Sequence, residues 1–390
     1  MIKAAVIAGV GESVRLGRVP DRSALQLMAE AARAALDDAG LAMADIDGFI
    51  TTPLRVTPMN PPATLVASAF GLQPAWLTTM DLGGASGTAM VQQAAAAIAA
   101  GQCRTVLCVG GQNLLSHGSR NSAVQAMAQS GVAHPQFEVT QGPLVASLYA
   151  LVASQHMATF GTTAEQMAAV AVAVRANAGL NPKAQKREAI TVADVLASRP
   201  ISSPLRMLDC SIVSDGAAAF IVTATDRAKD LRKPVVRILG AGYGQRHGYV
   251  GEARDLTVTG ARESGARAFA MAGLTPADVD VVELYDCFTI TVIVELEDLG
   301  FCPKGEGGRF VEGGRLRHDG GFPATTFGGL LSCAHFGLAA GMLHVVQGVR
   351  QLRGEAGAAQ VPGAEVALVH GNGGVISTHC TLVLGAEHTA

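Results

Sequence analysis

Four short segments of this chain carry side chains that could move protons or turns that could hold a carbonyl group. The first is a glycine turn, Gly84-Ala85-Ser86-Gly87, and the second is Tyr285-Asp286-Cys287-Phe288, at the end of an expected strand. The third covers residues 327–336 and contains His335, and the fourth is Val369-His370-Gly371-Asn372-Gly373-Gly374. A phenol or an imidazole can exchange a proton with an alcohol at about 3 Å. These residue types therefore suit acid-base chemistry on a small bound group.

Each of these residues also has an ordinary structural interpretation. Tyr285 could be a buried tyrosine with a satisfied hydroxyl group, and His335 could be a core histidine. Cys287 could equally be a small buried hydrophobic residue. Around His370 the glycines could be the important feature, because they allow a backbone to approach a ligand. Only the presence of all four segments together favours the chemical interpretation.

An internal repeat indicates which elements would position the four segments. Ala39-Gly40-Leu41 followed by Ala44-Asp45-Ile46-Asp47 recurs as Ala272-Gly273-Leu274 followed by Ala277-Asp278-Val279-Asp280. Each copy follows a strand that closes on glycines and an alanine-rich helical segment, and a short strand comes next. The sequence therefore predicts two copies of one strand-helix unit.

The expected elements of the two copies correspond in order. In the first copy, strand, helix, strand, helix and strand occupy residues 4–11, 23–39, 48–51, 86–100 and 105–109. In the second copy, the same order occupies residues 236–242, 261–272, 281–284, 338–352 and 365–369. Short β-branched runs that alternate with helices predict mixed sheets buried on both faces. We therefore expect an α/β fold in which two halves pack with helices between their sheets.

The chain between the two copies does not follow this order of strands and helices. Residues 118–200 contain no counterpart of the repeated unit, and we interpret them as an inserted loop or lid region. The segment 214–222 resembles a strand that returns to complete the first sheet. We therefore assign residues 1–117 and 201–232 to an N-terminal half, and residues 233–390 to a C-terminal half.

Composition limits the class of protein. The chain has 390 residues, of which 49% are hydrophobic and 16% charged, enough for a globular protein with two core-forming units. A net charge of -3 and scattered Lys and Arg residues predict no nucleic-acid partner. No apolar stretch approaches the roughly 20 residues of a membrane span, and no export signal is visible. Seven cysteines without CxxC pairs or metal-ligand spacing predict reduced thiols, a cytoplasmic location and no metal site.

In order and spacing, the four segments resemble those of thiolases. The turn at Gly84 is similar to the Cys-Ala-Ser-Gly turn, with Gly84 in the place of the nucleophilic cysteine. Residues 285–288 resemble Asn-Glu-Ala-Phe of ordinary thiolases and His-Asp-Cys-Phe of the sterol-carrier-protein type. Residues 327–336 look like Gly-Gly followed by Gly-His-Pro, and residues 369–374 stand in the place of the Cys-x-Gly turn. The chain is thus identified as a member of the thiolase superfamily, and the resemblance implies layered α-β-α-β-α architecture.

Two further segments fit the same resemblance. Ser214-Asp215-Gly216-Ala217-Ala218 matches a family segment, and Gln351-Leu352-Arg353-Gly354 resembles the sterol-carrier-protein-like branch rather than the biosynthetic thiolases. With the repeat, the resemblance covers nearly the whole chain.

The resemblance implies that the chain acts on thioesters without the nucleophilic cysteine that thiolases use. Thiolases carry an acyl group on the first-turn cysteine and stabilise thioester oxygens in two oxyanion holes. Gly84 removes that nucleophile, and Ser86 is a poor substitute because its hydroxyl group needs a positioned base. We expect an acyl-CoA substrate, no bound cofactor and no covalent acyl-enzyme. Backbone groups at Gly84, Gly373, Gly328 and Gly329 remain candidates for oxyanion and substrate contacts.

A pocket that stabilises an enolate without a nucleophile suits aldol chemistry on a 3-hydroxyacyl-CoA. The chain resembles the thiolase-like aldolases of steroid side-chain degradation, in which the acyl cysteine is absent and a tyrosine heads the second motif. This resemblance implies Tyr285 as an acid or base and His335 as the group that holds the thioester oxygen. His370 stands at or beside the place of the second cysteine, so either Tyr285 or His370 could be the base. Asp286 and Cys287 complete the predicted site.

Two other functions stay open at this point. The first is a thiolase or acetyl-CoA acyltransferase of the sterol-carrier-protein type, with Cys287 or another thiol as the acyl carrier, and it would require free CoA. The second is a non-catalytic subunit that binds acyl-CoA or lipid. Gly84 argues against the acyltransferase, and ionisable groups in the pocket positions argue against the binding subunit. The sequence does not fix the acyl chain or the direction of the reaction.

The resemblance also implies partners. The superfamily consists of dimers, so we expect a homodimer with residues 81–91 at its interface. Members of this branch commonly pair with a small protein that combines a zinc ribbon with an oligonucleotide-binding-fold barrel. This chain has no zinc-ligand pattern, so any zinc of that ribbon would belong to the partner.

Overall fold

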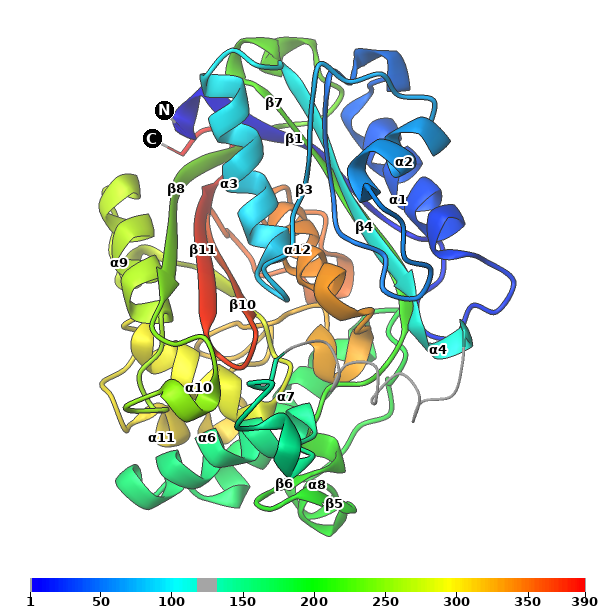
Figure 1. The fold of residues 1–390 in the computed structure, drawn as a ribbon. Helices are drawn as coiled ribbons and strands as arrows, with labels where there is room; N and C mark the ends of the chain where they lie inside the picture. The colour runs from blue at the N-terminus through cyan, green and yellow to red at the C-terminus, as the bar shows by residue number, and fades with distance from the viewer. Residues whose placement is uncertain (1, 118–131, 390) are drawn as a thin grey trace.

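The computed structural model describes residues 2–117 and 132–389, and within them a nine-stranded mixed sheet runs in the order β3-β2-β4-β7-β1-β8-β11-β10-β9 (Figure 1). The first half holds β1 (Ala5–Glu12), β2 (Gly48–Thr51), β3 (Trp76–Thr79), β4 (Thr105–Asn113) and β7 (Asp215–Ala224). The second holds β8 (Val236–Gln245), β9 (Val281–Leu284), β10 (Val366–Gly373) and β11 (Thr378–Gly385). The halves join where β1 and β8 pair over a short antiparallel register.

Each half of the sheet combines parallel and antiparallel pairs in the same way. β2 pairs in parallel with β3 and β4, and β9 pairs in parallel with β10. β7 lies antiparallel between β4 and β1, just as β11 lies antiparallel between β10 and β8. The prediction that residues 214–222 return to complete the first sheet is therefore confirmed.

The helices form the remaining layers. They are α1 (Ala24–Ala39), α2 (Pro62–Ala69), α3 (Ser86–Ala99), α9 (Ala261–Ala272) and α12 (Met342–Leu352). α3 and α12 contact each other and strands of both halves, whereas α1 packs on β1 and β7, and α9 packs on β8 and β11. Figure 1 shows α3 and α12 between the two halves, with α1 and α2 on one side and α9 on the other. The predicted layered architecture is confirmed.

The two outer helices lie close to their strands for the same reason in both halves. A Cβ atom on Gly9 would lie 2.3 Å from the Ala35 carbonyl oxygen, and one on Gly240 would lie 2.0 Å from the Ala268 carbonyl oxygen. Any larger residue would push the helix off the sheet. The glycines at the ends of these strands therefore encode the helix-sheet contact that the repeat predicted.

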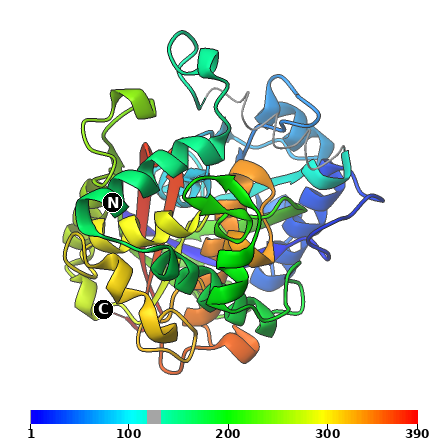
Figure 2. The ribbon, with the colours of Figure 1, turned by 90° about the horizontal axis from the view of Figure 1, so that it is seen from below.

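Further elements cover the lower end of the sheet in Figure 1, and Figure 2 shows this end face on. They are α6 (Val145–Phe160), α7 (Ala164–Leu180), α8 (Val192–Ala197), α10 (Thr289–Asp298) and α11 (Gly307–Phe310), with α4 (Leu114–His117) beside β4. A small hairpin of β5 (Pro200–Ser202) and β6 (Leu205–Arg206) lies nearby.

The predicted inserted region can be followed only in part. Its residues 118–131 lie outside the described residues, and its expected end at residue 200 falls inside β5. α7 contacts both α10 and the turn Gly329–Cys333 of the C-terminal half. The boundaries of the insertion remain a prediction.

The helix expected at residues 338–352 begins later than predicted. A 3-10 turn, Gly337–Gly341, comes first, and α12 starts at Met342. A Cβ atom on Gly341 would lie 2.2 Å from the Gly84 carbonyl oxygen. The 3-10 turn before α12 therefore packs closely against the Gly84 turn. In the part of the chain that the structure describes, no helix is long and apolar enough to span a membrane.

Candidate active site

Gly84 and Tyr285 meet between the two halves of the molecule. Gly84 lies just before α3, and Tyr285 directly follows β9. A Cβ atom built on Gly84 would lie 2.1 Å from Cζ of Tyr285 and 2.4 Å from the Asn372 carbonyl oxygen. Real atoms do not approach so closely, so the phenol ring occupies the space that a side chain at position 84 would need.

The hydroxyl group of Tyr285 faces His335. Its oxygen lies 3.2 Å from Nε2 of His335, and Nδ1 of His335 lies 2.9 Å from Oγ of Ser211. The backbone N–H of His335 donates to Oγ of Ser214. Tyr285 and His335 are almost fully buried, with 5% and 6% of their surfaces exposed.

The loop that presents His335 is held by Asp286. The carboxylate of Asp286 accepts hydrogen bonds from the backbone N–H groups of Leu330, at 2.7 Å, and Leu331, at 3.2 Å. A Cβ atom on Gly329, where φ is 54°, would lie 2.1 Å from a carboxylate oxygen of Asp286. The glycine therefore allows the turn Gly329–Cys333 to close over this carboxylate.

Burial controls the protonation of the pair. It raises the pKa of Tyr285 well above its usual value, with Cys287, Asp286 and Glu295 adding to the effect, so the phenol keeps its proton. Burial also lowers the pKa of His335 to about 4, and nearby His344 lowers it further, so the imidazole is neutral at pH 7. A neutral imidazole beside a phenol can accept the phenol's proton.

The structure does not bring His370 to Gly84. His370 lies in β10, and its neighbour Gly371 faces Ala85 and Thr88 at the start of α3. Side chains alternate along a strand, so His370 points to the opposite face of the sheet. There Nδ1 of His370 lies 2.8 Å from Oγ1 of Thr381. A direct role for His370 in proton transfer is still untested, and this position gives it no support.

Cys287 is buried beside Tyr285 but is poorly suited to carry an acyl group. Its Sγ lies 3.7 Å from Oγ1 of Thr291, and burial raises its pKa to about 12. The thiolate is the nucleophilic form of cysteine, so at neutral pH almost none of this group would be reactive.

The other predicted glycines pack backbone against backbone. A Cβ atom on Gly373 would lie 1.9 Å from the Leu82 carbonyl oxygen, and one on Gly328 would lie 2.4 Å from Cβ of Ala178. Gly328 also has φ of 95°, which favours glycine. These contacts explain the residue type at each position, whereas contact with a substrate stays a prediction.

Two residues near the pair were not singled out from the sequence as part of the site. His344 lies on α12, with its ring centroid 5.8 Å from that of Tyr285 and its Nε2 3.5 Å from Oδ1 of Asp286. Among the described residues, neither ring nitrogen of His344 has a hydrogen-bond partner. The sequence gives no indication that Ser211 belongs to the site, because what places it there is its contact with His335, 124 residues away. In the sequence, His344 looks like an ordinary core position, because almost all of the residues around it in α12 are apolar or buried.

Family models match most of the chain. The thiolase N-terminal domain matches residues 2–200, and the thiolase C-terminal domain-like model matches residues 242–386. The chain belongs to the thiolase family. The resemblance of the four segments to thiolases therefore reflects a family relationship.

Relatives of two kinds are equally similar to this chain. It is 36% identical over 381 residues to an acetyl-CoA acetyltransferase of Methanothermobacter thermautotrophicus, covering 96% of this chain and 98% of the relative. It is also 36% identical over 394 residues to the 17-hydroxy-3-oxo-4-pregnene-20-carboxyl-CoA lyase of Mycobacterium tuberculosis, covering 98% and 99%. The solved Ltp2-ChsH2(DUF35) aldolase superposes with a TM-score of 0.87 at 33% identity, covering 99% of both chains.

Proposed function

We propose that this chain is a thiolase-like lyase that cleaves a 3-hydroxyacyl-CoA by a retro-aldol reaction. The observation that carries the proposal is that the ring of Tyr285 fills the space where an acyl-carrying side chain at position 84 would project. Sequence identity does not separate the acetyltransferase from the lyase, because both relatives stand at 36%. The local geometry at Gly84 does, because it leaves no room for a covalent acyl group.

The proposed reaction begins at the substrate's hydroxyl group. The oxygen of Tyr285 takes that proton while its own proton passes over 3.2 Å to Nε2 of His335. The tautomer that accepts this proton has Nδ1–H of His335 donating to Ser211. The bond between C2 and C3 then breaks, the hydroxyl carbon becomes a ketone or aldehyde, and its electron pair forms the thioester enolate.

The enolate must then be stabilised and protonated. Backbone N–H groups at the start of α3, beside Gly84, carry partial positive charge and lie next to Tyr285. The proton held by His335 returns through Tyr285 to C2 and completes a shortened acyl-CoA. The substrate's own hydroxyl proton thus ends on carbon, so the reaction needs no free CoA and no other co-reactant.

The cysteines give an acyltransferase little support. Burial raises the pKa of Cys103 to about 11 and the pKa values of Cys302 and Cys380 to about 12, and those of Cys108 and Cys333 rise well above the usual value. All seven cysteines lie in the described part of the chain, and none of them is joined to another in a disulfide bond there. Reduced thiols are typical of the cytoplasm, where we propose that the protein works.

We further propose that the substrate is a bulky alicyclic 3-hydroxyacyl-CoA. The support is a relative, the Mycobacterium tuberculosis lyase, whose name specifies a 17-hydroxy steroid with a 20-carboxyl-CoA thioester. A tertiary alcohol of that kind cannot be oxidised to a 3-ketone, so retro-aldol cleavage is the direct way to break its C2–C3 bond.

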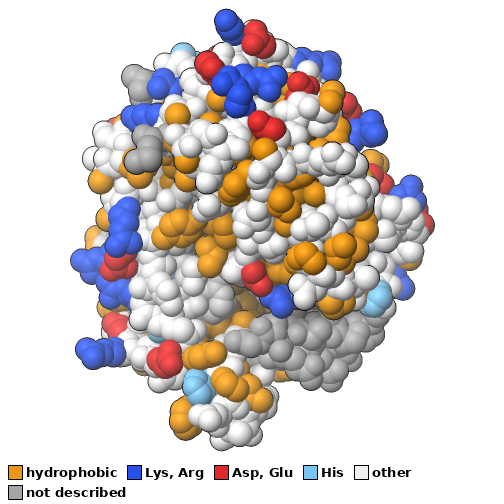
Figure 3. All heavy atoms as spheres, turned by 45° about the horizontal axis from the view of Figure 1, so that its top comes forward, with side chains coloured by type: hydrophobic (Ala, Val, Ile, Leu, Met, Phe, Trp, Pro, Cys, Tyr) orange, Lys and Arg blue, Asp and Glu red, His pale blue; other side chains and the backbone are white. Residues whose placement is uncertain are grey.

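Two protein partners fit the same proposal. The solved Ltp2-ChsH2(DUF35) aldolase is named as a complex with a DUF35 protein, so a small protein of that kind is our first candidate for this chain. A second copy of the chain is the other candidate, because β3 is an edge strand of the sheet with Leu77 exposed and Leu65 of α2 exposed beside it. Figure 3 shows hydrophobic side chains gathered in the middle of one face, with most charged side chains toward its margin.

Product analysis tests the proposal directly. The purified chain, alone and with the DUF35 partner, is incubated with tertiary-alcohol 3-hydroxyacyl-CoAs and with 3-ketoacyl-CoAs, each with and without free CoA. We expect a ketone and a shortened acyl-CoA from the hydroxy substrates without free CoA. Cleavage of only the 3-keto substrates, and only with free CoA, would show that the protein is an acyltransferase.

A further inference from the structure

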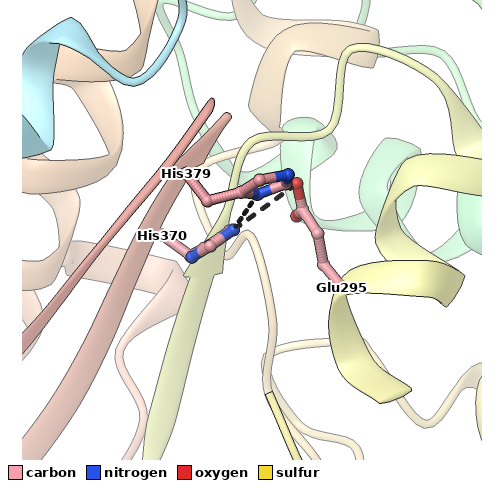
Figure 4. Close-up of side chains that lie close together, drawn as sticks. All are labelled: Glu295, His370 and His379. Carbon is pink, nitrogen blue, oxygen red and sulfur yellow. Dashed lines mark hydrogen bonds and ion pairs between the residues drawn. The ribbon is translucent and has the colours of Figure 1, made fainter. Parts of the chain in front are cut away.

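Three buried side chains converge on one point on the face of the sheet away from Gly84. His370 of β10 and His379 of β11 lie on neighbouring strands, and Glu295 reaches them from α10 (Figure 4). Nε2 of His370 lies 3.0 Å from Nδ1 of His379 and 3.8 Å from Oε1 of Glu295. One ligand atom from each residue lies within 4.8 Å of the others, and all three residues are fully buried.

The hydrogen bonds around the cluster fix where the protons can be. Nε2 of His379 lies 3.0 Å from the carbonyl oxygen of Ile376, which can only accept, so a neutral His379 carries its proton there. Its Nδ1 then presents a lone pair to His370. On the other side, Nδ1 of His370, Oγ1 of Thr381 and Oγ of Ser264 follow one another at 2.8 Å steps, and Ser264 donates to the Ala261 carbonyl group.

That second chain can be complete in only one tautomer of His370. If Nδ1 of His370 carries the proton, it donates to Thr381, Thr381 donates to Ser264, and Ser264 donates to Ala261, so each contact contains one proton. If Nε2 carries it instead, Thr381 must donate to His370. Ser264 then has one hydroxyl proton and two acceptors, Thr381 and the Ala261 carbonyl group. One of these two contacts is therefore left without a proton. Without an ion, Nε2–H of His370 can donate to Nδ1 of His379 at the expense of that one contact. In the tautomer that completes the chain, two imidazole lone pairs face each other, and a shared cation would satisfy both.

Glu295 supplies the negative charge that such a cation needs. Its Oε1 accepts a hydrogen bond of 2.6 Å from Nδ2 of Asn372, which orients the carboxyl group. Its Oε2, in contrast, is buried without a hydrogen-bond partner among the described residues. A buried polar atom without a partner is costly, and a bound ion is one of the recognised ways to satisfy it.

The positions of the rings also suit a metal ion. Two imidazoles bound to a tetrahedral zinc ion at about 2.1 Å have centroids about 5.2 Å apart. The centroids of His370 and His379 are 5.2 Å apart, although their facing nitrogens are closer together than two ligands of one ion would be. To bind one ion, the two rings would therefore have to tilt so that their facing nitrogens separate, whereas their centroids could stay where they are. Each imidazole already has an acceptor for its distal N–H, as metal-ligating histidines almost always do.

We propose that His370, His379 and Glu295 form a buried site for a divalent transition-metal ion, with zinc as the first candidate. Two histidines and one glutamate are an established ligand set for zinc, and an added water molecule completes a tetrahedron. From the neutral cluster, binding moves the proton of His370 from Nε2 to Nδ1 and releases the carboxyl proton of Glu295. The site ties β10, β11 and α10 together behind the loop that contains Gly373.

Metal content tests this site without any use of activity. The full-length protein is produced in medium that contains zinc, and separately in medium that contains cobalt, so that the ion can enter during folding. We expect about one metal ion per chain by mass spectrometry of the metals, and the visible absorption bands of tetrahedral cobalt. Glu295→Gln, which keeps the size of the side chain, should weaken cobalt binding at least tenfold, and Thr381→Val should weaken it by about tenfold through His370.

A matched control uses another buried histidine. His156 lies 3.1 Å from a carboxylate oxygen of Glu297, and within residues 2–117 and 132–389 it belongs to no cluster that could hold a metal ion, so His156→Gln should keep the full metal content. Circular dichroism establishes that each variant is folded. The proposal is wrong if folded wild-type protein from both media holds less than about a tenth of an ion per chain, or if Glu295→Gln binds cobalt as tightly as the wild type. Neither result would bear on the retro-aldol proposal, which uses none of these side chains.

Discussion

The phenol ring of Tyr285 lies where a side chain on Gly84 would have to be, with a virtual Cβ atom of Gly84 only 2.1 Å from Cζ of Tyr285. The two positions are 201 residues apart in the sequence and belong to different halves of the repeat. A bulky group at one position thus requires the smallest residue at the other. A side chain at position 84 and the phenol ring of Tyr285 therefore exclude each other in this arrangement.

This relationship predicts that a nucleophile cannot be restored by one substitution. Gly84→Ala and Gly84→Cys should each lower the free energy of unfolding by about 1–3 kcal/mol, because the new Cβ atom meets both Tyr285 and the Asn372 carbonyl group. Neither variant should gain acyltransferase activity. Urea denaturation measures the stability, and the CoA-dependent cleavage of 3-ketoacyl-CoA measures the activity.

Gly179→Ala is the control for this change. It lies within α7, and its virtual Cβ atom has only one neighbour, at 3.4 Å, so alanine should be neutral or slightly stabilising. Gly84→Ala should cost less stability in a Tyr285→Ala background than in the wild type, because one of the two collisions is then absent. Strict additivity of the two substitutions would contradict the contact.

Tyr285→Phe is predicted to remove the proton relay and keep the ring. We expect kcat for retro-aldol cleavage to fall by about 10²- to 10⁴-fold with little change in KM, because the lost group acts on the reacting hydroxyl. Tyr243→Phe is a matched control, since its hydroxyl contacts only the Ala89 carbonyl group at 3.4 Å among the contacts described. Steady-state kinetics on a tertiary-alcohol substrate gives the comparison, and an unchanged kcat in Tyr285→Phe would exclude this tyrosine as the acid-base group.

The fold could be predicted from the sequence because short local patterns, chiefly glycines at helix ends and within strands, mark both copies of the repeat. Gly40 and Gly273 end α1 and α9 with φ near 75°, and the preceding strands carry glycines where each helix packs. These signals depend on neighbouring residues and on two periodicities that are visible without a structure. The Gly84 turn and Tyr285 were also found, because each lies in a short segment that resembles the family.

The remainder of the site depends on contacts that no local pattern records. The alignment of the turn at His370 was uncertain by one residue, and in a strand one residue decides between the two faces of the sheet. His344 and Glu295 lie in helices whose residues are almost all buried, so nothing distinguishes them from their neighbours. Their importance appears only when α12 is placed beside Tyr285 and α10 beside β10.

The protonation of His335 predicts an unusual pH profile. Its imidazole must be neutral to accept a proton, and burial lowers its pKa from 6.5 to about 4. We therefore expect kcat/KM to stay nearly constant from pH 7.5 down to about pH 5, and to fall only as the pH approaches 4. An acidic limb with a midpoint near 6.5 would show that an ordinary, accessible histidine is the base.

Glu283 predicts a pH dependence of stability that is separate from catalysis. It is fully buried in β9, where Oε1 accepts hydrogen bonds from the N–H and Oγ1 of Thr326, and burial raises its pKa from 4.5 to about 8. The folded protein thus keeps a proton that the unfolded chain loses near pH 4.5. The contribution of this group to stability is complete below pH 4.5 and is lost as the pH rises through about 8.

Glu283→Gln isolates that contribution, because the amide has the same shape and does not ionise. The free energy of unfolding of the variant, relative to the wild type, should increase between pH 5 and pH 8 by about 3–4 kcal/mol. Urea denaturation at several pH values gives both curves, and the difference between them cancels the other titrating groups. Parallel curves would mean that the Glu283 carboxyl group is ionised in the folded protein, with a cation or water molecule beside its Oε2, the oxygen that is otherwise buried without a partner in the described residues.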